Sequence, residues 1–140
     1  MTRPPLLAAL AGVFLVGCGG GSSVRTVPVS GKATFEGSPM SLGIVTYYPD
    51  ASKGNTSDHR PTGTIQADGT YKLVTAGKDG APVGWYKVTI NPNGMPADPT
   101  KGVPTPAKVG TRYQQPDTTP VQVEVVDSPG AKAYDVNAAK

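Results

Sequence analysis

Residues 62–92 carry the pattern that most constrains the fold. Three short runs of alternating apolar and polar side chains lie here, separated by Asp68-Gly69 and by a Gly-rich connection at residues 76–83. A two-residue period places successive side chains on opposite faces of a strand. Asp-Gly between two such runs is a strong hairpin signal. The stretch therefore predicts the centre of a small antiparallel sandwich.

The rest of the chain agrees with an all-β domain. Its 140 residues suit one domain, and 18 Gly and 15 Pro with only 16% charged residues suit turns rather than helices. Val dominates the aliphatic residues and is accompanied by Thr and Tyr, which fit a pleated surface. The sequence therefore predicts a single small antiparallel β-sandwich.

Further strands are predicted on both sides of this centre. We expect strands at residues 27–35, 43–48 and 121–125, with a short final strand at residues 133–136. Gly31 interrupts the first, which indicates a bulge or a close backbone approach. The side chains predicted to share inward faces are Val27, Val29, Ala33, Phe35, Val45, Tyr47, Tyr71, Leu73, Tyr86, Val88, Ile90, Val121, Val123 and Val125.

The N-terminus has the organisation of an export signal. Arg3 supplies a positive start, residues 6–16 are an apolar stretch, and small Gly17 precedes Cys18. Leu15-Val16-Gly17-Cys18 resembles the bacterial lipobox, which implies cleavage before a cysteine that carries diacylglycerol. A core cysteine or an ordinary cleavage site is the alternative.

This interpretation divides the chain into three parts. Residues 1–17 are a signal peptide, residues 18–23 are the lipidated Cys18 with a Gly/Ser tether, and residues 24–140 are the folded domain. The chain has one cysteine, so no internal disulfide can form. We expect an exported protein held in the bacterial cell envelope by its lipid, at the outer membrane or the periplasmic face. The net charge of +3 is spread without a basic run, so no nucleic-acid partner is expected.

Four blocks resemble bacterial carboxypeptidase regulatory-like lipoproteins in order and spacing. They are Val29-Ser30-Gly31-Lys32, Asp68-Gly69-Thr70-Tyr71, residues 80–90 (GAPVGWYKVTI) and Thr118-Thr119-Pro120-Val121. The resemblance covers most of residues 24–136. It implies a transthyretin-like or immunoglobulin-like sandwich of about seven strands, acting as a noncatalytic accessory domain, and it transfers no ligand site.

Residues 91–120 contain seven prolines and no sustained alternation, so no central strand is expected there. A loop of this length is uncommon and is often functional or disordered. A long surface excursion without a ligand is the interpretation that the absence of clustered aromatic or acidic residues favours.

The sequence contains few residues in patterns suited to catalysis or metal binding. His59, the only histidine, stands beside Asp58 in a polar loop without a nucleophile or further metal ligands. Asp68 is one carboxylate where a calcium loop needs several, which favours a hairpin turn. Related hydrolases end in Tyr-Arg-Gly-Ser, whereas residues 134–137 read Tyr-Asp-Val-Asn. We therefore predict no enzymatic activity, no metal and no cofactor.

Tyr48 and Trp85 are the candidate binding residues. Strand alternation places both opposite the predicted core side chains, where aromatic rings can stack on sugars or anchor a partner. Packing beneath a neighbouring loop is the alternative. The predicted function is a structural or protein-interaction module of the envelope that contacts an envelope protein or glycan. The alternative is a carbohydrate-binding or small-ligand-binding domain.

Overall fold

The computed structural model describes residues 23–96 and 98–140. The predicted signal peptide, the lipobox residues Leu15, Val16 and Gly17, the lipidation site Cys18 and most of the tether lie outside these residues. No helix in the described part is long and apolar enough to cross a membrane.

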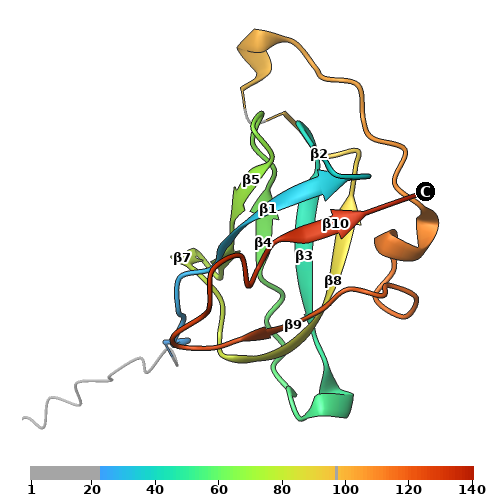
Figure 1. Ribbon diagram of the computed structural model, residues 1–140. Coiled ribbons are helices and arrows are strands. Elements are labelled where there is room, and N and C mark those ends of the chain that lie inside the picture. The colour runs from blue at the N-terminus through green and yellow to red at the C-terminus, as the bar shows by residue number, and fades with distance from the viewer. Residues whose placement is uncertain (1–22, 97) are drawn as a thin grey trace, which may run out of the picture.

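Two β-sheets form the described domain, which confirms the predicted all-β sandwich (Figure 1). One sheet has the strand order β7-β6-β4-β3-β8-β9. In the other, β1 lies between β10 and β2 and also pairs with β5. The strands are β1 (Ser30–Phe35), β2 (Ser38–Pro39), β3 (Ile44–Pro49), β4 (Thr62–Thr64), β5 (Thr70–Lys72), β6 (Val74–Thr75), β7 (Lys78–Asp79), β8 (Gly84–Asn91), β9 (Gln122–Val125) and β10 (Val136–Ala138).

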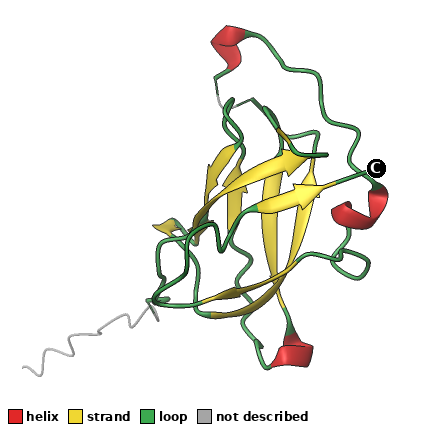
Figure 2. Ribbon diagram, viewed as in Figure 1, coloured by secondary structure: helices red, strands yellow, loops and turns green. Residues whose placement is uncertain are grey.

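The helical structure of the described residues consists of short 3-10 turns in the connections (Figure 2). They are η1 (Ala51–Lys53), η2 (Pro99–Lys101) and η3 (Thr111–Gln114). Prolines and glycines that bound these segments prevent longer helices.

The two longest strands of the larger sheet, β3 and β8, pair antiparallel through six residues. Their register places Val45 opposite Ile90 and Tyr47 opposite Val88, so these side chains share the inner face. All four are fully buried. The predicted inward faces of both strands are confirmed.

The chain passes from one sheet to the other at Leu73. Strand β5 pairs with β1, whereas β6, which begins one residue after Leu73, pairs with β4 through Val74 and Thr62. The prediction of a hairpin at Asp68-Gly69 is correct for the turn, where Gly69 adopts a φ of 87°, but wrong for the strand pairing. The strands on the two sides of the turn, β4 and β5, belong to different sheets and do not pair with each other. The side chain of Asp68 accepts hydrogen bonds from the backbone N–H and the hydroxyl of Thr70. The Asp68 carboxylate therefore closes a turn that connects the two sheets, instead of joining two paired strands.

The core lies between the sheets and contains most of the side chains predicted to face inward. Val27, Phe35 and Val121 are only partly buried but pack against it. The buried apolar residues that the alternation predicted are Val29, Ala33, Val45, Tyr47, Tyr71, Leu73, Tyr86, Val88, Ile90, Val123 and Val125.

Strand direction and strand ends differ from the prediction in three places. Strand β10 is parallel to β1 and begins at Val136, because residues 131–134 form a turn instead of a strand. Strand β1 begins at Ser30, and Val27 contributes only an isolated bridge to Ala81. The connection at residues 76–83 includes β7. Alternation predicts which side chains are buried but carries no information on strand direction.

The Pro-rich loop is not a uniform surface excursion. Its first half exposes Met95 and Val103, whereas Val109 and Tyr113 in its second half are buried in the core cluster. Thr119 is also buried and donates a 2.6 Å hydrogen bond from its hydroxyl to the Val88 carbonyl. Val109 and Tyr113 do not belong to an alternating apolar run, so the alternation pattern did not predict their burial.

Candidate functional site

Tyr48 and Trp85, the candidate binding residues, lie on the same face of the larger sheet. Tyr48 on β3 is opposite Lys87 on β8, and Trp85 is two residues before Lys87. Side chains two residues apart on a strand share a face, so the two aromatic rings are diagonal neighbours. Both are half-buried and lie on the face opposite the core.

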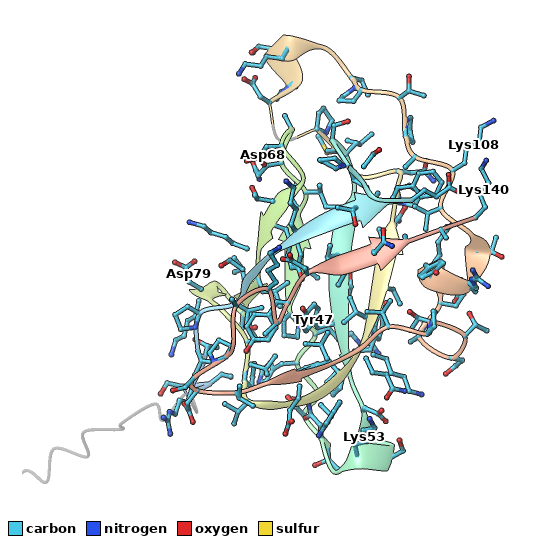
Figure 3. All side chains as sticks on the ribbon, viewed as in Figure 1. Tyr47, Lys53, Asp68, Asp79, Lys108 and Lys140 are labelled. Atoms are coloured by element: carbon cyan, nitrogen blue, oxygen red, sulfur yellow. The ribbon has the colours of Figure 1, made fainter. Side chains whose placement is uncertain are left out.

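A cation covers the Trp85 ring. The Lys53 ammonium lies 3.7 Å from the ring centroid. Lys53 ends η1, the short turn at the lower end of the view in Figure 3. An ammonium over an indole face is attracted by the negative potential of the ring. The ring face beneath Lys53 is therefore not free for stacking.

Backbone contacts hold η1 against the strand that carries Trp85. The Asp50 N–H and the Asn55 side-chain amide both donate to the Trp85 carbonyl, each at 2.9 Å. The Asp50 carboxylate caps η1 by accepting from the N–H and the hydroxyl of Ser52, at 3.1 and 2.5 Å. Gly54, with a φ of 85°, ends the turn. The position of Lys53 over the ring follows from these contacts.

A second cation lies over the second ring. The Arg60 guanidinium carbon is 5.2 Å from the centroid of Tyr48. Arg60 is exposed and precedes the buried Pro61, which fixes the end of the loop before β4. We call the surface formed by Tyr48, Lys53, Arg60, Trp85 and Lys87 the aromatic–cation face.

The cations of this face lack carboxylate partners. Among residues 23–96 and 98–140, no carboxylate oxygen lies within 4.0 Å of a side-chain nitrogen of Lys53, Arg60 or Lys87. The hydrogen bonds from Ser52 hold the pKa of the Asp50 carboxyl below its usual value, and the charges of Lys87 and Lys53 lower this pKa further. The Asp50 Oδ1 atom thus caps η1, while the charge of this carboxylate acts on Lys53 and Lys87 from more than 4.0 Å away.

Besides Asp50, a second acidic residue borders the face. Glu124 on the edge strand β9 is opposite Trp85, and its side chain is exposed. It forms no ion pair within the described residues. This carboxylate contributes negative potential beside the Trp85–Lys53 pair.

His59 does not assemble a catalytic or metal site with the residues described. Its Nε2 lies 3.7 Å from the carboxylate of the neighbouring, exposed Asp58. No group of three His, Cys, Asp or Glu residues suited to a metal ion occurs in the described part of the chain. Asp68 lies near the top of the view in Figure 3, far from η1.

Two open concavities lie away from Tyr48 and Trp85. One, of about 730 Å³, lies where β4 and β5 separate and is lined by Ile44, Thr62, Gly63, Thr64, Gln66, Thr70, Tyr71, Lys72 and Val74. The other, of about 620 Å³, lies between the Asp68 turn and the first half of the Pro-rich loop. Neither contains an aromatic lining residue other than the buried Tyr71.

Sequence reasoning identified the rings but not the cations over them. The alternation already placed Lys87 on the Trp85 face, which was a usable signal. Lys53 and Arg60 stand in a polar loop without periodicity, so only the folded loop shows which rings they reach.

Comparisons with protein-family models, curated proteins and solved structures found no match to this chain. The resemblance to carboxypeptidase regulatory-like lipoproteins therefore stays a prediction.

Proposed function

We propose that this protein is a noncatalytic interaction module of the bacterial cell envelope, held by a lipid on Cys18. The observation that carries the proposal is the aromatic–cation face, where the partly exposed Tyr48 and Trp85 occupy diagonal positions on neighbouring strands beneath Arg60 and Lys53. Aromatic and arginine side chains are enriched where proteins recognise partners. Accessory carboxypeptidase regulatory-like domains are the class that the sequence blocks suggest.

The proposed address rests on the sequence Leu15-Val16-Gly17-Cys18. Two acyl chains hold a protein stably on a bilayer, whereas one gives marginal binding. Expression of the full chain and of Cys18→Ser in a bacterium that lipidates lipoproteins, followed by membrane fractionation and fatty-acid labelling, tests this. We expect label and membrane retention only with Cys18. Equal retention and labelling of the two chains would refute the anchor.

The proposed interaction is tested by affinity capture from native envelopes. The full chain in detergent should retain a component that a Tyr48→Ala/Trp85→Ala variant loses. Met95→Ala/Val103→Ala changes two exposed apolar side chains of the Pro-rich loop and is the matched control. Unchanged capture by the Tyr48/Trp85 variant, with folding verified by circular dichroism, would count against the aromatic–cation face.

A carbohydrate-binding domain is the second candidate. The diagonal positions of Tyr48 and Trp85 favour it, because both side chains are partly exposed and Lys53 covers only one face of the Trp85 ring. Neither of the two concavities is lined by Tyr48 or Trp85, so neither would enclose a small ligand beside these rings. An extended glycan that lies along the surface is therefore favoured over a small enclosed ligand.

A further inference from the structure

We infer that the aromatic–cation face binds an acidic polysaccharide through the carboxylates of that polymer. The inference rests on the proposed function, because it names the ligand class for the same surface. Its basis is a group of three cations with no carboxylate of the described residues within 4.0 Å, two of which lie over the rings of Trp85 and Tyr48.

The three cations are available to an incoming anion. Lys53, Arg60 and Lys87 lie around two neighbouring rings, and no carboxylate of the described residues is within 4.0 Å of their nitrogens. A cation over a ring keeps its N–H groups directed to solvent while the ring limits its movement. A carboxylate can therefore be bound without first breaking an ion pair within 4.0 Å, and it adds to the more distant attraction between Asp50 and the charges of Lys53 and Lys87.

The covered rings argue against recognition of a neutral sugar alone. A sugar that stacks on the ring face under Lys53 must displace the ammonium from its position 3.7 Å above Trp85. A carboxylate approaching the ammonium keeps that contact and adds a charge-assisted hydrogen bond. The arrangement is thus better matched to an acidic ligand than to a neutral one.

The surroundings of the face favour a polysaccharide over an acidic protein. Protein interfaces usually bury a central apolar cluster. The large apolar side chains that are exposed in the described chain are Val74, Val83, Met95 and Val103, none of which belongs to the face. Its bordering side chains on β9, Gln122 and Glu124, are polar and exposed. A hydroxyl-rich polymer can hydrogen-bond to such a border.

Glu124 allows a test in which the affinity for an acidic polysaccharide should increase. Its carboxylate is opposite Trp85 and unpaired in the described chain, so it repels an anionic ligand. Glu124→Gln should therefore bind an acidic polysaccharide more tightly, by about twofold to fivefold. A decrease in affinity would overturn the inference.

The test measures binding of polygalacturonate, neutral dextran and polyglutamate to the full chain by titration calorimetry and by fluorescence of Trp85, the only tryptophan. We expect polygalacturonate to bind, and we expect its affinity to fall as the ionic strength is raised. Lys53→Gln/Arg60→Gln/Lys87→Gln should lose about tenfold in affinity. Lys32→Gln/Lys108→Gln/Lys140→Gln removes the same charge elsewhere and should lose much less; Figure 3 shows Lys108 and Lys140 far from Lys53.

Besides a loss of affinity in Glu124→Gln, four results would overturn the inference. Equal losses in the two triple variants would indicate attraction by net charge only. Equal binding of polyglutamate would indicate an acidic protein or any polyanion. Absence of polygalacturonate binding, or equally tight binding of dextran, would exclude an acidic polysaccharide. The proposed function would survive the dextran result, and it fails separately if envelope capture does not depend on Tyr48 and Trp85.

Discussion

The hydroxyl oxygens of Tyr47 and Tyr71 lie 3.0 Å apart between the two sheets. Tyr47 belongs to β3 of the larger sheet and Tyr71 to β5 of the smaller one. The Tyr71 hydroxyl donates to the Tyr134 carbonyl, so the Tyr47 hydroxyl donates to Tyr71. Figure 3 shows Tyr47 in the interior of the domain. This chain of hydroxyls connects both sheets to the segment before β10.

Removal of the Tyr71 hydroxyl should lower the free energy of unfolding more than removal of the Tyr47 hydroxyl. Tyr47→Phe deletes one donor and should lower the free energy of unfolding by about 1 kcal/mol. Tyr71→Phe leaves both the Tyr47 hydroxyl and the Tyr134 carbonyl without this partner, and should cost about 2–3 kcal/mol. Urea unfolding of the two variants and of the double variant measures the difference. Equal costs for the two single variants would contradict the order of donors.

Alkaline pH should destabilise the fold. Burial raises the pKa of Tyr47 and of Tyr71 above the ordinary phenol value of 10.0, and the neighbouring hydroxyl of Tyr71 raises that of Tyr47 further. The folded state therefore keeps these protons while the unfolded state releases them. The stability is fully present below pH 10 and falls above it, by up to about 1.4 kcal/mol per pH unit for each group. Urea midpoints from pH 8 to 11 test this, with Tyr47→Phe expected to show a shallower decline. A midpoint that stays constant across this range would refute it.

Gly31 should not tolerate a side chain. A Cβ at this position would overlap the backbone carbonyl of Tyr134, which explains the close approach that the sequence indicated. Gly31→Ala should lower the unfolding free energy by about 1–3 kcal/mol through overpacking. Gly130→Ala is the matched control, because nothing lies within 4 Å of its added Cβ. Thermal melting of both variants measures the effect, and similar melting temperatures would contradict the predicted overlap.

The two halves of the Pro-rich loop should differ in their contribution to stability. Tyr113→Ala removes a buried ring from the core cluster and should cost about 3 kcal/mol. Met95→Ser and Val103→Ser change exposed side chains of the same loop and should each stay within about 0.5 kcal/mol. Chemical denaturation of the three variants tests this, and a neutral Tyr113→Ala would show that the second half does not support the core.

The sequence by itself determined the class of fold, the turn at Asp68-Gly69 and the inward faces of the main strands. These features depend on local properties: a two-residue period fixes the face of each side chain, and glycine permits the positive φ that the turn needs. For the same reason it placed Tyr48 and Trp85 on the face opposite the core.

Only the tertiary structure decided which segments meet. It brought Lys53 and Arg60 from an irregular loop onto two rings, paired β10 parallel to β1, and packed Tyr113 into the core. It also aligned Tyr47, Tyr71 and Tyr134, which stand 24 and 63 residues apart along the chain. Such contacts depend on loop paths and strand pairing, and no local periodicity encodes either.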